Sequence, residues 1–271
     1  MLPSEESLRD GNIDEALTRL QAQVRKEPAN PKYRVFLFQL LAIRGDWNRA
    51  MTQLNVLKDM DASTIPMAQA YAEALKCEVL RADIFAGRRS PLIFGDPEQW
   101  IALIAEALRA TADGRHAQAQ EIRAQAFETA PATAGTIDGN AFEWIADADS
   151  RLGPILEAVV NGRYYWIPFH RILRIDVEAP ADLRDLVWMP AHFAWSNGGE
   201  AVGLIPTRYP GSEASDDPQV RLARKTDWTQ HDGDAWLGLG QRILATDADE
   251  YPLMTVREVR IEAAPAVGSG A

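Results

Sequence analysis

The sequence has a single cysteine, Cys77, among 271 residues. One thiol cannot form an intrachain disulfide or build a cysteine-based zinc site. No apolar run approaches the roughly 20 residues that a membrane helix needs, and the opening segment MLPSEESLRDGN lacks the basic-then-apolar pattern of a secretory signal. These absences predict a cytoplasmic protein in which Cys77 is a small buried helix residue and not a reactive thiol.

Basic side chains are also scarce. The chain has 28 Lys and Arg against 39 Asp and Glu, a formal net charge of -11. Residues 1–134 contain 16 basic and 18 acidic side chains, so residues 135–271 contain 12 and 21, a net charge of -9. Nucleic acids and anionic membrane surfaces require clustered Lys and Arg. We therefore expect neither as a partner, whereas the acidic second half would suit a basic one.

Motifs of known chemistry are missing as well. The four histidines form none of the spacings of metal sites: His116, His170, His192 and His231. There is no G-x-S-x-G nucleophile motif and no Walker motif, and the segment GLGQR stops after G-x-G. We predict no catalytic, cofactor-binding or metal-binding residues, and we interpret the chain as a non-enzymatic interaction protein.

One pair of carboxylates leaves an alternative open. Asp147 and Asp149 are two residues apart, so in a strand they would share one face. Paired carboxylates can bind a divalent cation or divide acid and base roles. An ion-pair network with Arg151 and Arg163 would explain the same residues. The alternative function is a small ligand-binding or hydrolytic enzyme that uses Asp147, Asp149 and Arg163.

The first half of the chain is repetitive. Three residue pairs recur at a spacing of 34, the period of tetratricopeptide repeats: Gly11 and Gly45, Ala16 and Ala50, Leu20 and Leu54. The glycines allow the turn between antiparallel helices to close, and the alanines allow the helices to approach. A third copy begins at Gly114 and Ala119. Residues 1–134 are therefore predicted to form a TPR-like helical repeat domain.

The third copy is separated from the first two by a degenerate unit. Residues 67–81 have helical periodicity, with Met67, Tyr71, Leu75 and Val79 on one face. The segment 85–96 contains AGRRSPLIFGD, which breaks this pattern. We expect it to be a loop or a shortened helix.

The second half has the alternation of strands. Asn161-Gly162 separates two runs of branched and aromatic residues, 155–160 and 163–169, which is a strong hairpin signal. Further strands are expected at 142–148, 170–177, 186–195, 201–209 and 253–261, with a long excursion over 210–240. The predicted fold class is α+β, with a mostly-β, small-barrel-like domain over 135–262 and a disordered tail over 263–271.

Aromatic and arginine side chains gather in this half. They are the residue types that dominate protein-binding hot spots, although they also fill cores and domain interfaces. Together with the acidic pair and its neighbouring arginine they are our candidates for partner-binding or family-motif residues: Asp147, Asp149, Arg151, Arg163, Tyr164, Tyr165, Trp166, Trp188, Arg208 and Tyr209.

Several segments carry a family resemblance. DADSRLGPILEAVVNGRYYWIPF, DLRDLVWMPA, IPTRYPGSE, GLGQR and VREVRIE resemble the C-terminal module of the ImpE/SciE/TagJ family, and the resemblance extends over roughly residues 3–262. That family comprises accessory proteins of bacterial type VI secretion systems. The resemblance implies a cytoplasmic adaptor that binds the N-terminal helical region of the small subunit of the contractile sheath. It also implies a link to the ATPase that disassembles the contracted sheath.

Overall fold

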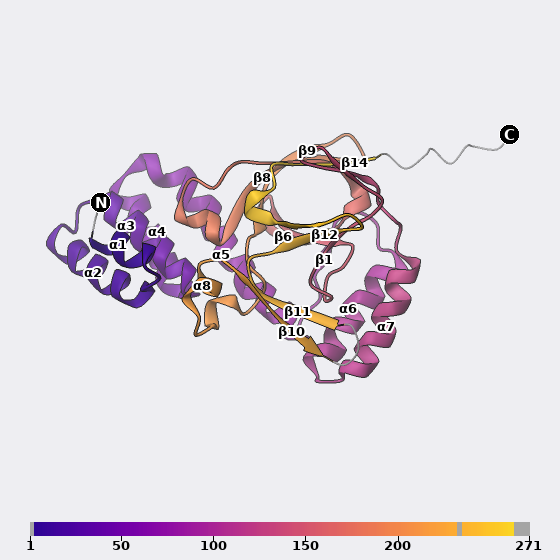
Figure 1. Ribbon diagram of the computed structural model, residues 1–271. Coiled ribbons are helices and arrows are strands. Elements are labelled where there is room, and N and C mark those ends of the chain that lie inside the picture. The colour runs from indigo at the N-terminus through magenta and orange to yellow at the C-terminus, as the bar shows by residue number, and fades with distance from the viewer. Residues whose placement is uncertain (1–2, 232–234, 263–271) are drawn as a thin grey trace.

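The computed structural model describes residues 3–231 and 235–262 (Figure 1). The predicted tail, 263–271, lies outside the described residues. The chain begins with a stack of helices: α1 (Pro3–Arg9), α2 (Ile13–Lys26), α3 (Pro31–Ile43), α4 (Trp47–Met60) and α5 (Ile65–Phe85). A further antiparallel pair, α6 (Gln99–Ala112) and α7 (His116–Thr129), follows.

The repeat positions have the expected roles. Gly11, Gly45 and Gly114 lie at the turns between helices with φ of 87°, 73° and 75°, a region that residues with a Cβ rarely adopt. Ala16 and Ala50 are fully buried, which allows close approach of neighbouring helices. The predicted spacing therefore places both the turns and the helix contacts correctly.

Helix α5 changes its buried face along its length. Tyr71 and Leu75 pack into a core cluster with α2, α3 and α4, whereas Cys77 and Ile84 belong to a second cluster with α6 and the sheet. The expectation that Val79 faces inward is wrong, because its side chain is 50% exposed. The second half of α5 packs on the sheet instead of on another repeat, and this turns a different side of the helix inward.

The segment after α5 departs from its predicted form. Residues 85–96 are not only a loop: they contain the short strand β1 (Leu92–Ile93), which pairs in parallel with β6 (Arg163–Pro168). The helical half thus contributes a strand to the sheet of the other half.

A nine-stranded sheet, in the order β1-β6-β5-β9-β8-β7-β14-β2-β3, forms the framework of the second half. The strands not yet introduced are β2 (Gly135–Ile137), β3 (Asn140–Phe142), β5 (Ile155–Val160), β7 (Ile172–Val177), β8 (Trp188–Trp195), β9 (Glu200–Pro206) and β14 (Glu258–Ile261). In the β5–β6 hairpin, Asn161 and Gly162 have φ of 50° and 72°, as the turn prediction requires.

Smaller elements complete the structure. One three-stranded sheet has the order β13-β12-β4 and consists of β4 (Ile145–Asp147), β12 (Ile243–Thr246) and β13 (Glu250–Pro252). The predicted strand over 142–148 is divided between β3 and β4. The excursion over 210–240 contains the helix α8 (Pro218–Arg221) and the hairpin of β10 (Thr226–His231) and β11 (Ala235–Gly240).

The predicted α+β class is confirmed, with helices first and a β-rich second half. The domain boundary between residues 134 and 135 remains a prediction. One buried cluster draws residues from both sides of it, including Ile84 and Trp100 from helices and Tyr164 and Trp166 from β6.

Candidate functional site

A network of buried charges lies where α5 meets the sheet. The guanidinium of Arg81, on α5, donates to both carboxylate oxygens of Glu157, on β5, over 2.6 and 2.9 Å. Arg81 also donates to the carbonyl of Arg208 over 2.8 Å. Glu157 is fully buried and Arg81 is 4% exposed. A buried charge requires such partners, because desolvation otherwise makes its ionised form unfavourable.

Arg242 extends this network to β4. Its guanidinium donates to the carboxylates of Asp147 and Glu157, and its Nε donates to the carbonyl of Pro206 over 2.8 Å. All three charged side chains have no exposed surface. Two arginines therefore share Glu157, and one of them also holds Asp147.

Aromatic side chains complete the network. Tyr164 donates its hydroxyl hydrogen to Glu157, and Trp166 donates its indole N–H to the Tyr164 hydroxyl over 2.9 Å. The indole of Trp188 donates to Glu78 over 3.0 Å, and Arg81 donates to the same carboxylate over 3.4 Å. The polar atoms of these rings are thereby satisfied inside the core.

The environment shifts the two central carboxyl pKa values in opposite directions. Burial would raise the pKa of Glu157, but the adjacent Arg81 and Arg242 outweigh it and lower the pKa to about 2. Burial dominates at Asp147, where it raises the pKa to about 7 against the attraction of Arg242. Burial also raises the pKa of Tyr164, and the charge of Glu157 adds to this effect.

Asp149 and Arg151 form a separate pair beside the network. Arg151 donates to Asp149 over 2.8 and 2.5 Å, and the backbone N–H of Gly238 donates to Asp149 over 2.8 Å. The Asp149 N–H in turn donates to Asp147 over 2.9 Å. The two acidic residues of the predicted pair are therefore neighbours, but each has its own arginine.

Arg208 links the β-rich half to the helical stack. Its Nη1 donates to the carbonyls of Ile43, on α3, and Arg221, over 2.8 and 2.5 Å. Burial lowers the pKa of this guanidinium to about 10. Tyr209, fully buried, accepts the N–H of Ile243 over 3.0 Å.

The structure brings eight of the ten predicted residues into this interior. Arg163 is exposed at the turn end of β6, and Tyr165 is half-buried on the opposite face from Tyr164. The alternative enzyme site needs Asp147 and Asp149 near Arg163 and open to a substrate. Instead their carboxylates are buried and bonded to Arg242 and Arg151.

Sequence reasoning did not select the central residues Arg81, Arg242, Glu78 and Glu157 as candidates. One signal was available. Glu157 interrupts the otherwise apolar run of residues 155–160, and an acidic residue inside such a strand needs a buried cation. Nothing in the local sequence of α5 marks Arg81 as that cation.

Neither a metal-binding cluster nor a membrane-spanning helix occurs among the residues that the structure describes. Across residues 3–231 and 235–262, no group of three or more His, Cys, Asp or Glu side chains is arranged to hold a metal ion. Within the same ranges, no helix has the length and apolar character needed to cross a bilayer.

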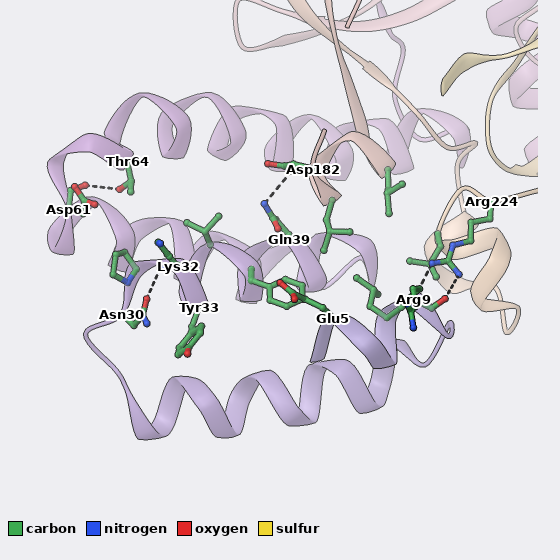
Figure 2. A pocket seen from close by; sticks show the side chains of 17 residues that line it. Glu5, Arg9, Asn30, Lys32, Tyr33, Gln39, Asp61, Thr64, Asp182 and Arg224 are labelled. Carbon is green, nitrogen blue, oxygen red and sulfur yellow. Dashed lines mark hydrogen bonds between the residues drawn. The ribbon is translucent and has the colours of Figure 1, made fainter. Parts of the chain in front are cut away.

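A groove of about 920 Å³ opens on the helical stack (Figure 2). We call it the helical groove. It lies between α1, α3 and the 3₁₀ helix Leu183–Leu186, which reaches across from the β-rich half. Apolar side chains form much of its lining: Leu8, Tyr33, Val35, Phe36, Leu183 and Leu222.

The lining also contains charged side chains of both signs: Glu5, Asp61, Asp182, Arg9, Lys32 and Arg224. Arg224 donates to the carbonyls of Arg9 and Leu8 over 3.0 and 3.2 Å, and Gln39 donates to Asp182 over 3.3 Å. These contacts attach segments of the second half to the end and the side of the groove.

Comparisons with known proteins agree with the resemblance of the motifs. Residues 139–260 match the family described as ImpE protein. A relative from Pseudomonas aeruginosa, the "Type VI secretion system accessory component TagJ", is 49% identical over 259 residues, covering 96% of this chain and 91% of the relative. The crystal structure of protein VPA1032 from Vibrio parahaemolyticus has the same fold, with a TM-score of 0.87 at 24% identity over 96% of this chain and 97% of that one. The chain therefore belongs to the ImpE/SciE/TagJ family.

Proposed function

We propose that this protein is a non-enzymatic accessory component of a type VI secretion system. In this role it acts as an adaptor that binds the N-terminal helical region of the small contractile-sheath subunit. The observation that carries the proposal is the helical groove, since it offers a binding surface of suitable chemistry on the repeat helices. Family membership and the TagJ relative are the basis for assigning the protein to a type VI secretion system.

The helical groove suits an amphipathic helix. Such a helix presents apolar residues at i, i+3, i+4 and i+7, which dock into an apolar groove while its polar face stays in water. Tyr33 and Val35 are half-buried on α3, so each keeps surface available for contact. The charges of both signs in the lining would fix the register and direction of the bound helix.

The length of the apolar run in α3 supports this use. Residues 33–43 are more apolar than one buried helix face requires. Phe38, Leu40 and Leu41 pack inside the stack with at most 1% exposure, whereas Tyr33 and Val35 line the groove. One helix thus serves both the core and the groove.

The proposal has two further parts. The protein links the sheath to the ATPase that disassembles it, and it acts in the cytoplasm. Because the sequence contains no Walker motif, ATP hydrolysis belongs to the partner. Size-exclusion chromatography of the protein, the sheath subunit and the ATPase tests the link. We expect the sheath subunit and the ATPase to elute in one peak only when this protein is present. If its addition leaves the elution of both components unchanged, the link is contradicted.

Titration calorimetry of the full chain with a peptide covering the N-terminal helix of the sheath subunit tests the groove. We expect saturable binding that weakens at least about tenfold in Tyr33→Ala and Leu183→Ala, since truncating a hot-spot residue costs about 2 kcal/mol or more. Leu173→Ala is the matched control. Leu173 is a 43% exposed apolar residue on β7 that does not line the groove.

Two outcomes would contradict the proposal. If the titration with the sheath peptide produces no heat of binding across a broad concentration range, the sheath helix is not the partner. Equal binding by the Tyr33→Ala and Leu173→Ala variants keeps the partner but removes the groove as its site. Thermal unfolding of each variant, followed by circular dichroism, distinguishes loss of binding from loss of fold.

A further inference from the structure

A second groove, of about 440 Å³, lies between the end of α7 and strand β4. We call it the aromatic groove, and its lining includes Phe127, Pro131, Trp144, Ser150 and Pro154. Strand β4 is the outermost strand of its three-stranded sheet. The lining residues of the aromatic groove and the helical groove do not overlap, so an occupant of one leaves the other free.

Two large aromatic side chains of this groove are exposed. Phe127 and Trp144 are 39% and 41% exposed, although apolar rings of this size are usually more deeply buried. Exposed apolar surface with a polar border is typical of protein interaction sites, and aromatic residues contribute strongly to binding there.

The surroundings hold the ring of Phe127 and the backbone of Trp144. The ring of Phe127 covers Gly153 so closely that a Cβ there would lie 2.3 Å from it. The carboxylate of Asp247 accepts the backbone N–H groups of Glu143 and Trp144 over 2.7 and 3.4 Å. A binding surface fixed in this way loses little conformational entropy on association.

Acidic residues neighbour the lining of the aromatic groove along the chain, and the carboxylate of Asp247 contacts the backbone of Trp144. Glu128 and Glu143 are exposed next to the two aromatic residues, and Asp247, Asp249 and Glu250 lie on the adjoining β12–β13 segment. Residues 124–150 and 243–256 contain no Lys or Arg. Four arginines adjoin these ranges: Arg123 and Arg242 are buried, Arg151 is paired with Asp149, and Arg257 is exposed. An apolar centre with one sign of charge around it favours an occupant of opposite charge.

We propose that the aromatic groove is a second docking site, which binds a short partner segment with a bulky apolar residue flanked by Lys and Arg. The apolar side chain would lie between Phe127 and Trp144. The flanking cations would face the carboxylates of Glu128, Glu143 and the β12–β13 segment. The protein would then have two separate binding surfaces, one on the repeat helices and one beside the sheet.

The test uses two synthetic seven-residue peptides and the full chain. The basic probe has a Leu-Phe-Leu centre with two Lys or Arg on each side, and the acidic probe has Glu at the four flanking positions. Binding is followed by fluorescence anisotropy of the labelled peptide and by the indole N–H signal of Trp144 in NMR spectra, assigned with Trp144→Phe. We expect saturable binding of the basic probe, a shift of the Trp144 signal, and weaker binding as salt is raised.

Matched variants locate the site. We expect Trp144→Ala and Phe127→Ala to weaken binding of the basic probe at least about tenfold. Leu173→Ala and Tyr33→Ala should leave the affinity for this probe unchanged. Because Phe127 packs on Gly153, its loss could disturb the fold. Glu128→Lys and Glu143→Lys alter only exposed charges. We expect these variants to bind the basic probe more weakly and the acidic probe more tightly.

Three results would overturn this inference: no binding of the basic probe at millimolar concentration, equal binding of both probes, or unchanged binding by Trp144→Ala. None of these results would affect the proposal for the helical groove, because the Tyr33→Ala variant and the sheath peptide test that groove separately.

Discussion

Arg81 and Glu157 are held together by two hydrogen bonds of 2.6 and 2.9 Å, although they are 76 residues apart in the chain. Arg81 belongs to the longest helix of the stack, and Glu157 belongs to the hairpin strand β5 at the centre of the family motif. Because both side chains are buried, this ion pair fixes the position of α5 on the sheet. The helical half and the β-rich half are joined by charge as well as by apolar contact.

Replacing Arg81 tests the importance of this pair. Arg81→Met leaves Glu157 with Arg242 alone, and breaking a buried ion pair costs about 3–5 kcal/mol. We expect a loss of that size in the free energy of unfolding, measured by urea denaturation. Arg88→Met is the control, because Arg88 is an exposed arginine paired with Asp83 just after the same helix. That surface pair should contribute at most about 1 kcal/mol. Equal losses of stability in Arg81→Met and Arg88→Met would therefore contradict the importance of the buried pair.

Asp147 makes the stability depend on pH. Its pKa is about 3.9 in an unfolded chain and about 7 in the folded one. Between these values the folded state binds more protons than the unfolded state, so stability falls as pH rises from about 4 to about 7. Glu157, with its pKa lowered to about 2, has the opposite effect on stability. Its ionised form stabilises the folded state, and this stabilisation is lost as pH falls from about 4 to about 2.

Asp147→Asn isolates the first effect, because the amide cannot ionise. The stability of the variant relative to the natural protein should rise between pH 5 and pH 7, at up to about 1 kcal/mol per pH unit. Urea denaturation at a series of pH values measures this difference. A constant difference would mean that Asp147 is already ionised at pH 5.

The sequence predicted those parts of the fold that depend on local chemistry. Gly11 and Gly114 marked the helix turns, and Asn161-Gly162 marked the β5–β6 hairpin, because these residues tolerate positive φ. The candidate site was predicted only in part. Asp147 and Tyr164 were recognised, but Arg242, which donates to Asp147, and Arg81, which donates to the same carboxylate as Tyr164, were not. Contacts between residues so distant in the chain are defined by tertiary packing.

The misplaced elements have the same cause. Val79 fits the helical period of α5, yet the helix passes from the repeat stack onto the sheet and buries a different face. The segment 85–96 has too few residues of strand type to reveal β1, which exists because β6 offers it a parallel edge. Each feature depends on a neighbour that is distant in the sequence.

Cys77 should be inert while the protein is folded. The residue is 6% exposed, and burial raises the pKa of its thiol to about 12, with Glu78 adding to the effect. Since the thiolate is the reactive form, native protein at pH 8 should react with a thiol-specific reagent at least about a hundredfold more slowly than the urea-unfolded chain. Rapid stoichiometric labelling of the native protein would show that this part of α5 opens readily.

The boundary between residues 134 and 135 leads to the last prediction. Removing residues 1–134 takes away Arg81, β1 and the helices that cover Trp166 and Tyr164. The fragment 135–262 would then expose buried rings and leave Glu157 with one arginine, so we expect a soluble chain with altered packing and a weakened near-ultraviolet circular dichroism signal. The fragment 65–262 retains α5, β1 and the complete charge network, and it should unfold cooperatively in urea. Equally cooperative unfolding of both fragments would show instead that the β-rich half is an independent domain, with Arg81 and Glu157 forming a contact between two separate cores.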